Sequence, residues 1–191
     1  MSDSLRIPVN IVFRDRQAIM SAVTRARTLA LVLLTAALTA GCGLAYSIRG
    51  QRAFDVRSES MAPTIQPGTR VVADLVDHYT PRTGDIVVIQ PPEKWGANGP
   101  VLTRVIGIPG STLKCCDANG KVLLDDKPLL EPYTGLNGNA DRYFDAVTVP
   151  SGRVWVMGDN RELALDSRSY RRMLGDGTVP VENVIGVVHS E

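Results

Sequence analysis

The stretch Val101-Leu-Thr-Arg-Val-Ile-Gly-Ile108 decides the fold of this chain. It is short and rich in β-branched residues, it ends at Pro109-Gly110, and its apolar residues lack helical spacing. Two runs of the same kind precede it, Arg70-Val-Val-Ala-Asp-Leu-Val76 and Asp85-Ile-Val-Val-Ile-Gln90, and Pro or Gly bounds each of them. The three runs predict short β-strands separated by turns.

The sequence beyond residue 108 continues this pattern of short runs and turns. The predicted hairpins are residues 112–116 with 121–124, around Asp117-Ala-Asn-Gly120, and residues 147–149 with 153–157, around Pro150-Ser-Gly152. Residues 183–189 predict a last strand, and residues 129–143 a loop. The expected fold class is therefore mainly β, with one antiparallel β domain over residues 49–191.

A different pattern precedes this domain. Residues 28–48 read TLALVLLTAALTAGCGLAYSI, 21 residues without a charge, and a helix of that length covers a hydrocarbon core about 30 Å thick. Five arginines and only two aspartates come before the run, so the positive-inside rule places residues 1–27 in the cytoplasm. The prediction is a cell-membrane protein with a single transmembrane helix over 28–48 and an extracytoplasmic β domain.

Other interpretations of the apolar run stay open. A cleaved signal peptide could end near Ala-Leu-Thr-Ala-Gly, and a lipoprotein could be anchored through Cys42, which follows Gly41. A buried core helix is disfavoured because 21 uncharged residues exceed the 10–14 expected of one. The run continues past Cys42 through Ile48, which favours a retained anchor.

Composition excludes several classes of function. The 191 residues include 21 Lys and Arg against 20 Asp and Glu, and a net charge of +1 gives little attraction for nucleic acid. No glycine-rich phosphate loop and no metal-ligand spacing occur, so neither a nucleotide, a cofactor nor a metal is expected. Three cysteines cannot form a multi-bridge framework, and the adjacent Cys115 and Cys116 are expected to be unlinked side chains of a strand.

Four segments combine polar residues with rigid turns. They are Ser58-Glu-Ser-Met-Ala-Pro-Thr64, Gly84-Asp-Ile-Val-Val88, Thr103-Arg-Val-Ile-Gly-Ile-Pro-Gly110, and Met157-Gly-Asp-Asn-Arg161 with Asp166-Ser-Arg168. Each alone is typical of an ordinary polar turn. Together, in this order after one apolar run, they resemble bacterial type I signal peptidase (leader peptidase, serine peptidase family S26). These membrane-bound serine endopeptidases remove signal peptides from exported preproteins.

The resemblance implies a role for each matching residue. Ser60 falls at the position of the nucleophile, and Ser58 at that of a hydroxyl that forms the oxyanion hole with the Ser60 backbone N–H. Fixed donors of this kind stabilise the alkoxide that develops when a peptide carbonyl is attacked. The resemblance also implies an ion-pair network that supports the site, formed by Arg104, Asp159, Asp166 and Arg168. Signal peptides of translocated preproteins and the lipid bilayer are the partners it implies.

The sequence departs from the family at the general base. The family has a lysine immediately before the Arg of R-V-I-G, and this chain has Thr103, which is not expected to act as a base. Ala164 replaces the small hydroxyl residue that contacts this lysine in the family. The remaining candidate bases are His78, His189, Lys94 and Lys114, none at the family position. Two hypotheses therefore stand: a signal peptidase that uses Ser60 with an unassigned base, or a weak or inactive paralogue that binds extended peptides. The Cys42 lipoprotein is a third.

Overall fold

The computed structural model describes residues 50–137 and 143–189. The chain divides into two units, Met1–Arg49 and Gly50–Glu191, and the predicted span over residues 28–48 lies outside the described residues. Within the described ranges, no helix combines the length and the apolar character needed to cross a membrane.

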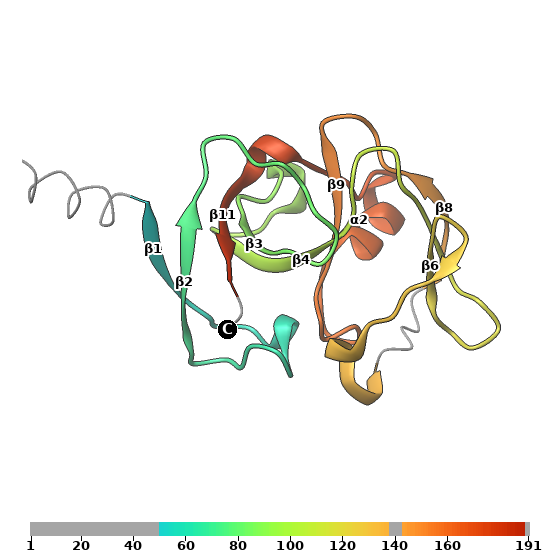
Figure 1. Cartoon of the computed structure of the whole chain (residues 1–191), viewed down its shortest axis with the longest axis horizontal. Coiled ribbons are helices and arrows are strands. Elements are labelled where there is room, and N and C mark those ends of the chain that lie inside the picture. Colours follow the sequence, from blue (N-terminus) through green and yellow to red (C-terminus); the bar gives the residue numbers. More distant parts are fainter. Residues whose placement is uncertain (1–49, 138–142, 190–191) are drawn as a thin grey trace, which may run out of the picture. The chain divides into compact units, whose positions relative to one another are not determined.

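The larger of two sheets has seven strands (Figure 1). In spatial order these are β1 (Gln51–Asp55), β2 (Arg70–Leu75), β11 (Val184–Val188), β3 (Ile86–Ile89), β4 (Val101–Gly107), β9 (Arg153–Met157) and β10 (Val179–Pro180). Every neighbouring pair is antiparallel. The strands predicted over residues 70–76, 85–90, 101–108 and 183–189 are confirmed, with ends shifted by at most one residue.

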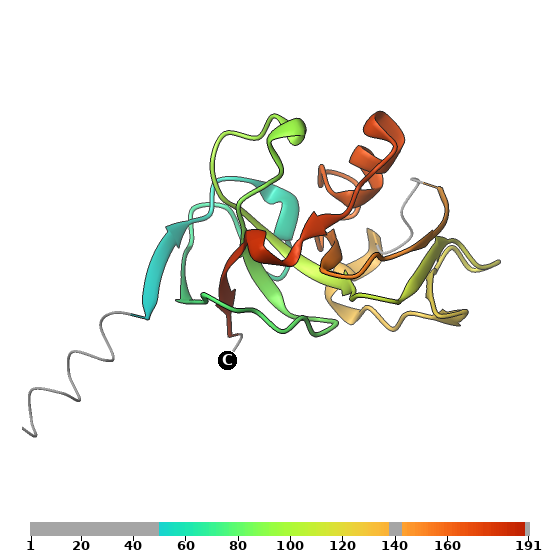
Figure 2. The same ribbon diagram turned by 90° about the horizontal axis from the view of Figure 1, so that it is seen from above.

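The smaller sheet has four antiparallel strands. They are β7 (Lys127–Pro128), β6 (Val122–Leu124), β5 (Thr112–Cys115) and β8 (Phe144–Thr148), in that order. In Figures 1 and 2, β6 and β8 lie at the opposite end of the described domain from β1 and β2. The predicted mainly β, antiparallel fold class is therefore confirmed for the described residues.

One predicted hairpin is confirmed and the other is wrong. β5 and β6 pair across residues 117–120 as expected. β8 and β9 follow each other in sequence, but β8 pairs with β5 while β9 pairs with β4 and β10. Residues 150–152 therefore connect the two sheets, because both faces of β9 are buried and its edges are already occupied.

β9 separates two hydrophobic cores. Val154 and Val156 pack in a cluster with β3, β4 and Tyr170, and Trp155 packs with β5 and β8 in a second cluster. β4 also lies between the two clusters, because Val105 packs in the first and Ile106 in the second. Because side chains alternate along a strand, a run that is apolar on both faces fits between two cores. β4 and β9 are therefore fixed from both sides.

Helical segments are short. The 3-10 helices are η2 (Glu59–Met61), η3 (Glu93–Trp95), η4 (Pro132–Asn137) and η5 (Val181–Asn183). One α-helix, α2 (Ser167–Leu174), was not predicted from the sequence. Asp166 caps it by accepting a hydrogen bond from the Arg168 N–H, and Gly175 ends it in a left-handed conformation.

The structure joins Cys115 and Cys116 in a disulfide, so the expectation of two unlinked side chains is wrong. β5 ends at Cys115, and Cys116 is therefore not held on the opposite face of the strand.

Candidate active site

Ser60 is the middle residue of η2, and this short helix begins directly after Ser58, whose backbone is extended. The two hydroxyl oxygens are 2.9 Å apart and hydrogen bond to each other. Ser60 is half-buried, and the next residue, Met61, is completely buried and anchors the short helix in the domain. The structure thus brings the two predicted site serines into direct contact, with Ser58 exposed to solvent.

The loop after β9 lies against Ser60. The Asn160 backbone N–H donates to the Ser60 carbonyl oxygen at 3.0 Å. Gly158 approaches so closely that an added Cβ would lie 2.5 Å from the Ser60 carbonyl oxygen and 2.5 Å from the Ala164 Cβ. Ser60 and Ala164, which are far apart in sequence, are therefore neighbours through the backbone of Gly158.

Thr103 lies in the middle of β4, opposite Val87 of β3. Its side chain is buried, with 3% of the residue exposed, and its Oγ1 has no hydrogen-bond partner among the described residues. A buried hydroxyl without a partner has lost its hydration without compensation. Position 103 thus buries a hydroxyl whose hydrogen-bonding capacity is unsatisfied among the described residues.

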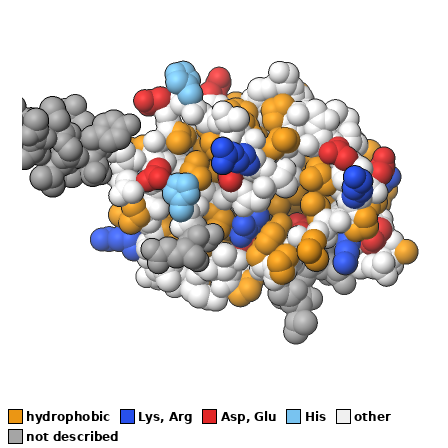
Figure 3. All heavy atoms as spheres, viewed as in Figure 1, with side chains coloured by type: hydrophobic (Ala, Val, Ile, Leu, Met, Phe, Trp, Pro, Cys, Tyr) orange, Lys and Arg blue, Asp and Glu red, His pale blue; other side chains and the backbone are white. Residues whose placement is uncertain are grey.

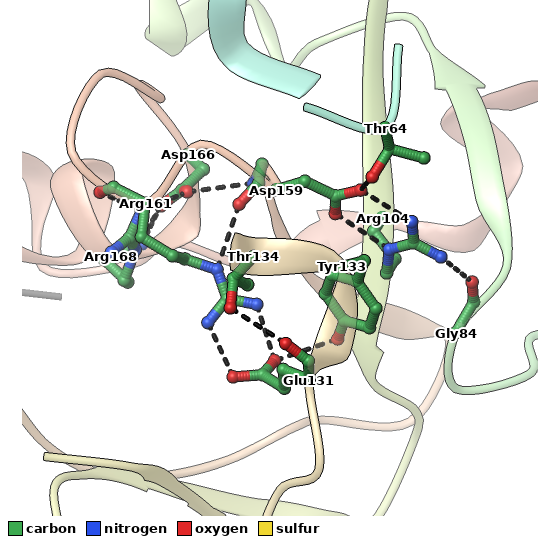
Figure 4. Close-up of polar contacts among 11 residues, drawn as sticks. Thr64, Gly84, Arg104, Glu131, Tyr133, Thr134, Asp159, Arg161, Asp166 and Arg168 are labelled. Carbon is green, nitrogen blue, oxygen red and sulfur yellow. Dashed lines mark hydrogen bonds and ion pairs between the residues drawn. The ribbon is translucent and has the colours of Figure 1, made fainter. Parts of the chain in front are cut away.

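Arg104, the next residue, belongs to a buried ion-pair network (Figure 4). Its Nε and Nη2 donate to the two carboxylate oxygens of Asp159 at 2.8 and 2.6 Å, and its Nη1 donates to the Gly84 carbonyl oxygen at 2.8 Å. The Thr64 hydroxyl also donates to Asp159. Burial acts to lower the pKa of Arg104, but the hydrogen bonds and charge of Asp159 outweigh it and raise that pKa. The pair fixes the segment after η2 to β4.

Asp166 and Arg168 form a second buried pair. Arg168 Nε and Nη2 donate to Asp166 at 2.9 and 2.7 Å, and Asp166 also accepts the Gly158 N–H at 3.1 Å. Arg168 Nη2 donates in addition to the Arg161 carbonyl oxygen at 2.9 Å. The structure therefore places all four predicted support residues in one region beneath Ser60, with Gly158 as the link.

A third buried pair was missed by the sequence analysis. Arg161 is completely buried, its Nη1 donates to Glu131 Oε2 at 2.8 Å, and its Nε donates to the Gly158 carbonyl oxygen at 3.0 Å. Tyr133 donates to Glu131 at 2.9 Å, and its ring centroid lies 4.0 Å from the Arg104 guanidinium carbon. Arg161 belongs to the motif M-G-D-N-R, so the sequence did mark it as a candidate site residue. Glu131 lies in the predicted loop over residues 129–143, where no motif marks it.

The other candidate bases lie elsewhere. Lys94 pairs with Asp176, Lys114 pairs with Asp126, and His189 contacts Asp74. Both histidine side chains of the chain lie at the surface, on the face that Figure 3 shows. Among residues 50–137 and 143–189, no lysine or histidine nitrogen hydrogen bonds to Ser60 Oγ.

A groove of about 500 Å³ leads to Ser58. One wall is the segment from Arg52 to Ser58, and the other is the start of β4 at Val101 and Leu102. β1 is an edge strand of its sheet, and the pairing of β9 with β4 begins only at Arg104. Both walls therefore keep backbone N–H and C=O groups that an extended peptide could pair with.

Comparisons with known proteins support the same family as the sequence motifs. The family described as "Signal peptidase, peptidase S26" matches residues 26–190. A probable signal peptidase I-1 of Synechocystis sp. is 37% identical over 138 residues, which cover 69% of this chain and 65% of that protein. Signal peptidase I U of Bacillus subtilis is 34% identical over 145 residues, which cover 70% and 71%.

A crystal structure of a signal peptidase I from Enterococcus faecalis V583 is also similar, with a TM-score of 0.47 and 26% identity, over 59% of this chain and 99% of that one. The chain spans 65% of the length of the Synechocystis protein, slightly less than two thirds. Since the family model covers most of the sequence, the chain belongs to the peptidase S26 family of signal peptidases.

Proposed function

We propose that this chain is a serine endopeptidase that removes signal peptides from exported preproteins, with Ser60 as the nucleophile. The observation that carries the proposal is the pair of serine hydroxyls, 2.9 Å apart, of which Ser58 lines a groove of about 500 Å³. The relatives that match the chain are named signal peptidases, which supports the same substrate class.

The chemistry follows from the placement of the two hydroxyls. Ser60 Oγ attacks the carbonyl carbon of the scissile bond, and the carbonyl oxygen becomes an oxyanion. The Ser58 hydroxyl and the Ser60 backbone N–H would donate to this oxygen, where preorganised donors lower the barrier most. The C–N bond then breaks, the amine of the mature protein leaves with a proton, and water hydrolyses the acyl-enzyme ester.

The proton of Ser60 must leave without help from position 103. A threonine hydroxyl has no useful basicity near neutral pH, and Ala164 offers no polar atom in its side chain. Ser60 is half-buried, so hydroxide or water in the groove can take the proton directly. The proposed peptidase therefore works slowly, through nucleophile and oxyanion donors alone, as residual activities of incomplete serine sites do.

We also propose the topology predicted from the sequence. Residues 28–48 would span the cell membrane, with residues 1–27 in the cytoplasm and residues 49–191 on the extracytoplasmic side, next to the lipid bilayer. The uncharged run and its basic flank support this arrangement. Intact-mass measurement tests it, because a mature chain that begins at a diacylated Cys42 would replace the helix with a lipid anchor.

The decisive experiment is a cleavage assay with the full-length chain in detergent and a purified preprotein. We expect slow cleavage at the signal-peptide junction, identified by N-terminal sequencing of the product, and none with Ser60→Ala. Equal product from the parent chain and from Ser60→Ala would contradict the proposal.

A second function, binding extended peptides without cutting them, is favoured by one specific observation. Thr103 Oγ1 is buried without a partner, and the Ala164 side chain lies beside Gly158, so both groups that would hold a basic amine are apolar or unsatisfied. This function predicts no cleavage by the parent chain. Thr103→Lys combined with Ala164→Ser should then create cleavage, by about 10²-fold or more over background. Efficient cleavage by the parent would exclude the binding-only function.

A further inference from the structure

The groove beside Ser58 carries an excess of positive charge. Three of its lining residues are charged, namely Arg52, Asp55 and Arg57. Asp55 is already paired, because Arg70 Nε donates to its carboxylate at 2.8 Å and holds the pKa of Asp55 below its ordinary value. Neither Arg52 nor Arg57 has a carboxylate within ion-pair distance among the described residues. Two guanidinium groups are therefore available to a ligand in the groove.

The two arginines lie on either side of an apolar part of the groove lining. Arg57 immediately precedes Ser58, and Arg52 lies at the far end of the same segment, with its guanidinium carbon 5.1 Å from the centroid of the Phe54 ring. At about 3.3 Å per residue in extended chain, the six steps along the chain from Arg52 to Ser58 span at most about 20 Å. The apolar residues that line the groove are Ala53, Phe54, Val56, Val71, Val88, Pro100, Val101 and Leu102.

We propose that this groove selects extended peptides that carry an acidic side chain within about six residues of the bond at Ser60, through Arg52 and Arg57. The inference rests on the proposed function, because it assumes that the groove receives the peptide. An arginine recognises a carboxylate with two parallel hydrogen bonds, which a glutamine of the same shape cannot match. A lysine in the same peptide position would instead be repelled.

The expected preference is modest, because both arginines are exposed. Ion pairs between exposed groups of this kind change affinity by about two- to threefold each. Two such contacts give a preference of about three- to tenfold. At 0.5 M salt the screening length falls to about 4 Å, so most of the preference should disappear there.

The experiment measures binding rather than cleavage. The full-length Ser60→Ala chain in detergent is titrated into fluorescently labelled peptides that span a preprotein cleavage junction, and the dissociation constant is read from anisotropy. Glu, Gln or Lys is placed in turn at each of the six positions on either side of the junction. We expect Glu to bind about three- to tenfold more tightly than Gln at one or two of these positions, with Lys weakest.

The variants assign this preference to the two arginines. Arg52→Gln with Arg57→Gln should reduce the Glu preference to less than about twofold, as should 0.5 M salt with the unaltered arginines. Arg172→Gln, an exposed arginine on α2 that does not line the groove, is the matched control and should keep the full preference.

The outcomes separate this inference from the proposed function. Equal binding of Glu, Gln and Lys peptides, or a Glu preference that survives in the double variant, would overturn the acidic selectivity and leave the peptide groove intact. Failure of every peptide to bind would overturn the groove as a peptide site, and with it the proposed function.

Discussion

We propose that the residue at position 103 determines whether this site has a side-chain proton acceptor. A lysine amine in a buried apolar setting can lose its charge and accept a proton, whereas a threonine hydroxyl cannot. The surroundings of Thr103 agree with the loss, because its Oγ1 has no partner among the described residues and the Ala164 side chain carries no polar atom. The two site serines are nevertheless both present, with their hydroxyls in contact.

The proposed lack of a side-chain base at position 103 has a consequence for the pH dependence of cleavage. With hydroxide as the proton acceptor, the rate of Ser60-dependent cleavage should rise about tenfold per pH unit from pH 7 to pH 9, without a plateau. Initial rates in constant ionic strength buffers measure this slope, with Ser60→Ala as the background at each pH. A plateau in this range would reveal a side-chain base and contradict the assignment.

Ser58 should act only on the transition state. Its hydroxyl is exposed and lies beside Ser60 Oγ, so Ser58→Ala removes one proposed oxyanion donor and little packing. We expect kcat to fall by about 10²-fold with little change in KM, as for other oxyanion donors. Ser151→Ala, at an exposed turn far along the chain, is the control. A rise in KM with unchanged kcat would show a binding role instead.

At the scale of the elements, the sequence predicts those strands whose pattern is local. β3 and β4 stand out because their β-branched residues are buried on both faces and Pro or Gly ends each run. β1, Gln51–Asp55, lacks β-branched residues and was not predicted, because its strand conformation comes from pairing with β2. α2 was missed because its eight residues are too few for a periodic signal.

The candidate site was predictable to a similar extent. The motifs contained Arg104, Asp159, Asp166 and Arg168, which the structure does bring together. Glu131 lies 30 residues from its partner Arg161, in a segment with no strand pattern, so nothing local marks it. Long-range ion pairs of this kind depend on how two sheets are connected, and that connection was the one hairpin predicted wrongly.

The loop after β9 should be intolerant of any side chain at position 158. A Cβ there would lie 2.5 Å from both the Ser60 carbonyl oxygen and the Ala164 Cβ, so Gly158→Ala must separate the loop from η2. We expect unfolding free energy to fall by about 1–3 kcal/mol and cleavage to fall more than tenfold. Urea unfolding and the cleavage assay measure the two effects. Gly50→Ala, with no heavy atom within 4 Å of the added Cβ, should change neither. Full activity in Gly158→Ala would contradict the close contact of Gly158 with Ser60 and Ala164.

At the scale of the whole described domain, buried ion pairs tie the two sheets together. Glu131 follows β7 of the smaller sheet, and Arg161 follows β9 of the larger sheet, with both side chains almost fully buried. Arg161 also donates a hydrogen bond to the carbonyl oxygen of Gly158, and Gly158 packs against the backbone of Ser60. The position of Ser60 thus depends on a contact between the two sheets as well as on its own strand connections.

Glu131→Gln should therefore destabilise the domain strongly. It leaves the Arg161 guanidinium buried without a countercharge, which costs about 3–5 kcal/mol in comparable buried pairs. The melting temperature should fall on the order of 10 °C. Asp126→Asn, which breaks the exposed pair with Lys114, is the matched control and should change stability by less than about 1 kcal/mol. Equal effects of the two substitutions in a thermal melt would show that the Glu131 pair does not hold the sheets together.

Acid should weaken the domain through Asp176, which joins the loop before β10 to Lys94. Burial acts to raise the pKa of Asp176, but hydrogen bonds from Lys94 and Thr178 outweigh it and lower that pKa to about 2. Because the pKa of an aspartate in the unfolded chain is about 3.9, the carboxylate stabilises the fold above pH 4, and this contribution is lost as pH falls towards 2.

The Asp176 side chain is 43% exposed, so solvent screening limits the contribution to about 1 kcal/mol. In urea unfolding, Asp176→Asn should be less stable than the parent at pH 6 by this amount, and most of this difference should be gone at pH 2. Asp77→Asn, at an exposed position, should follow the parent at both values. A stability difference between Asp176→Asn and the parent that persists unchanged at pH 2 would show that the carboxylate charge is not its source.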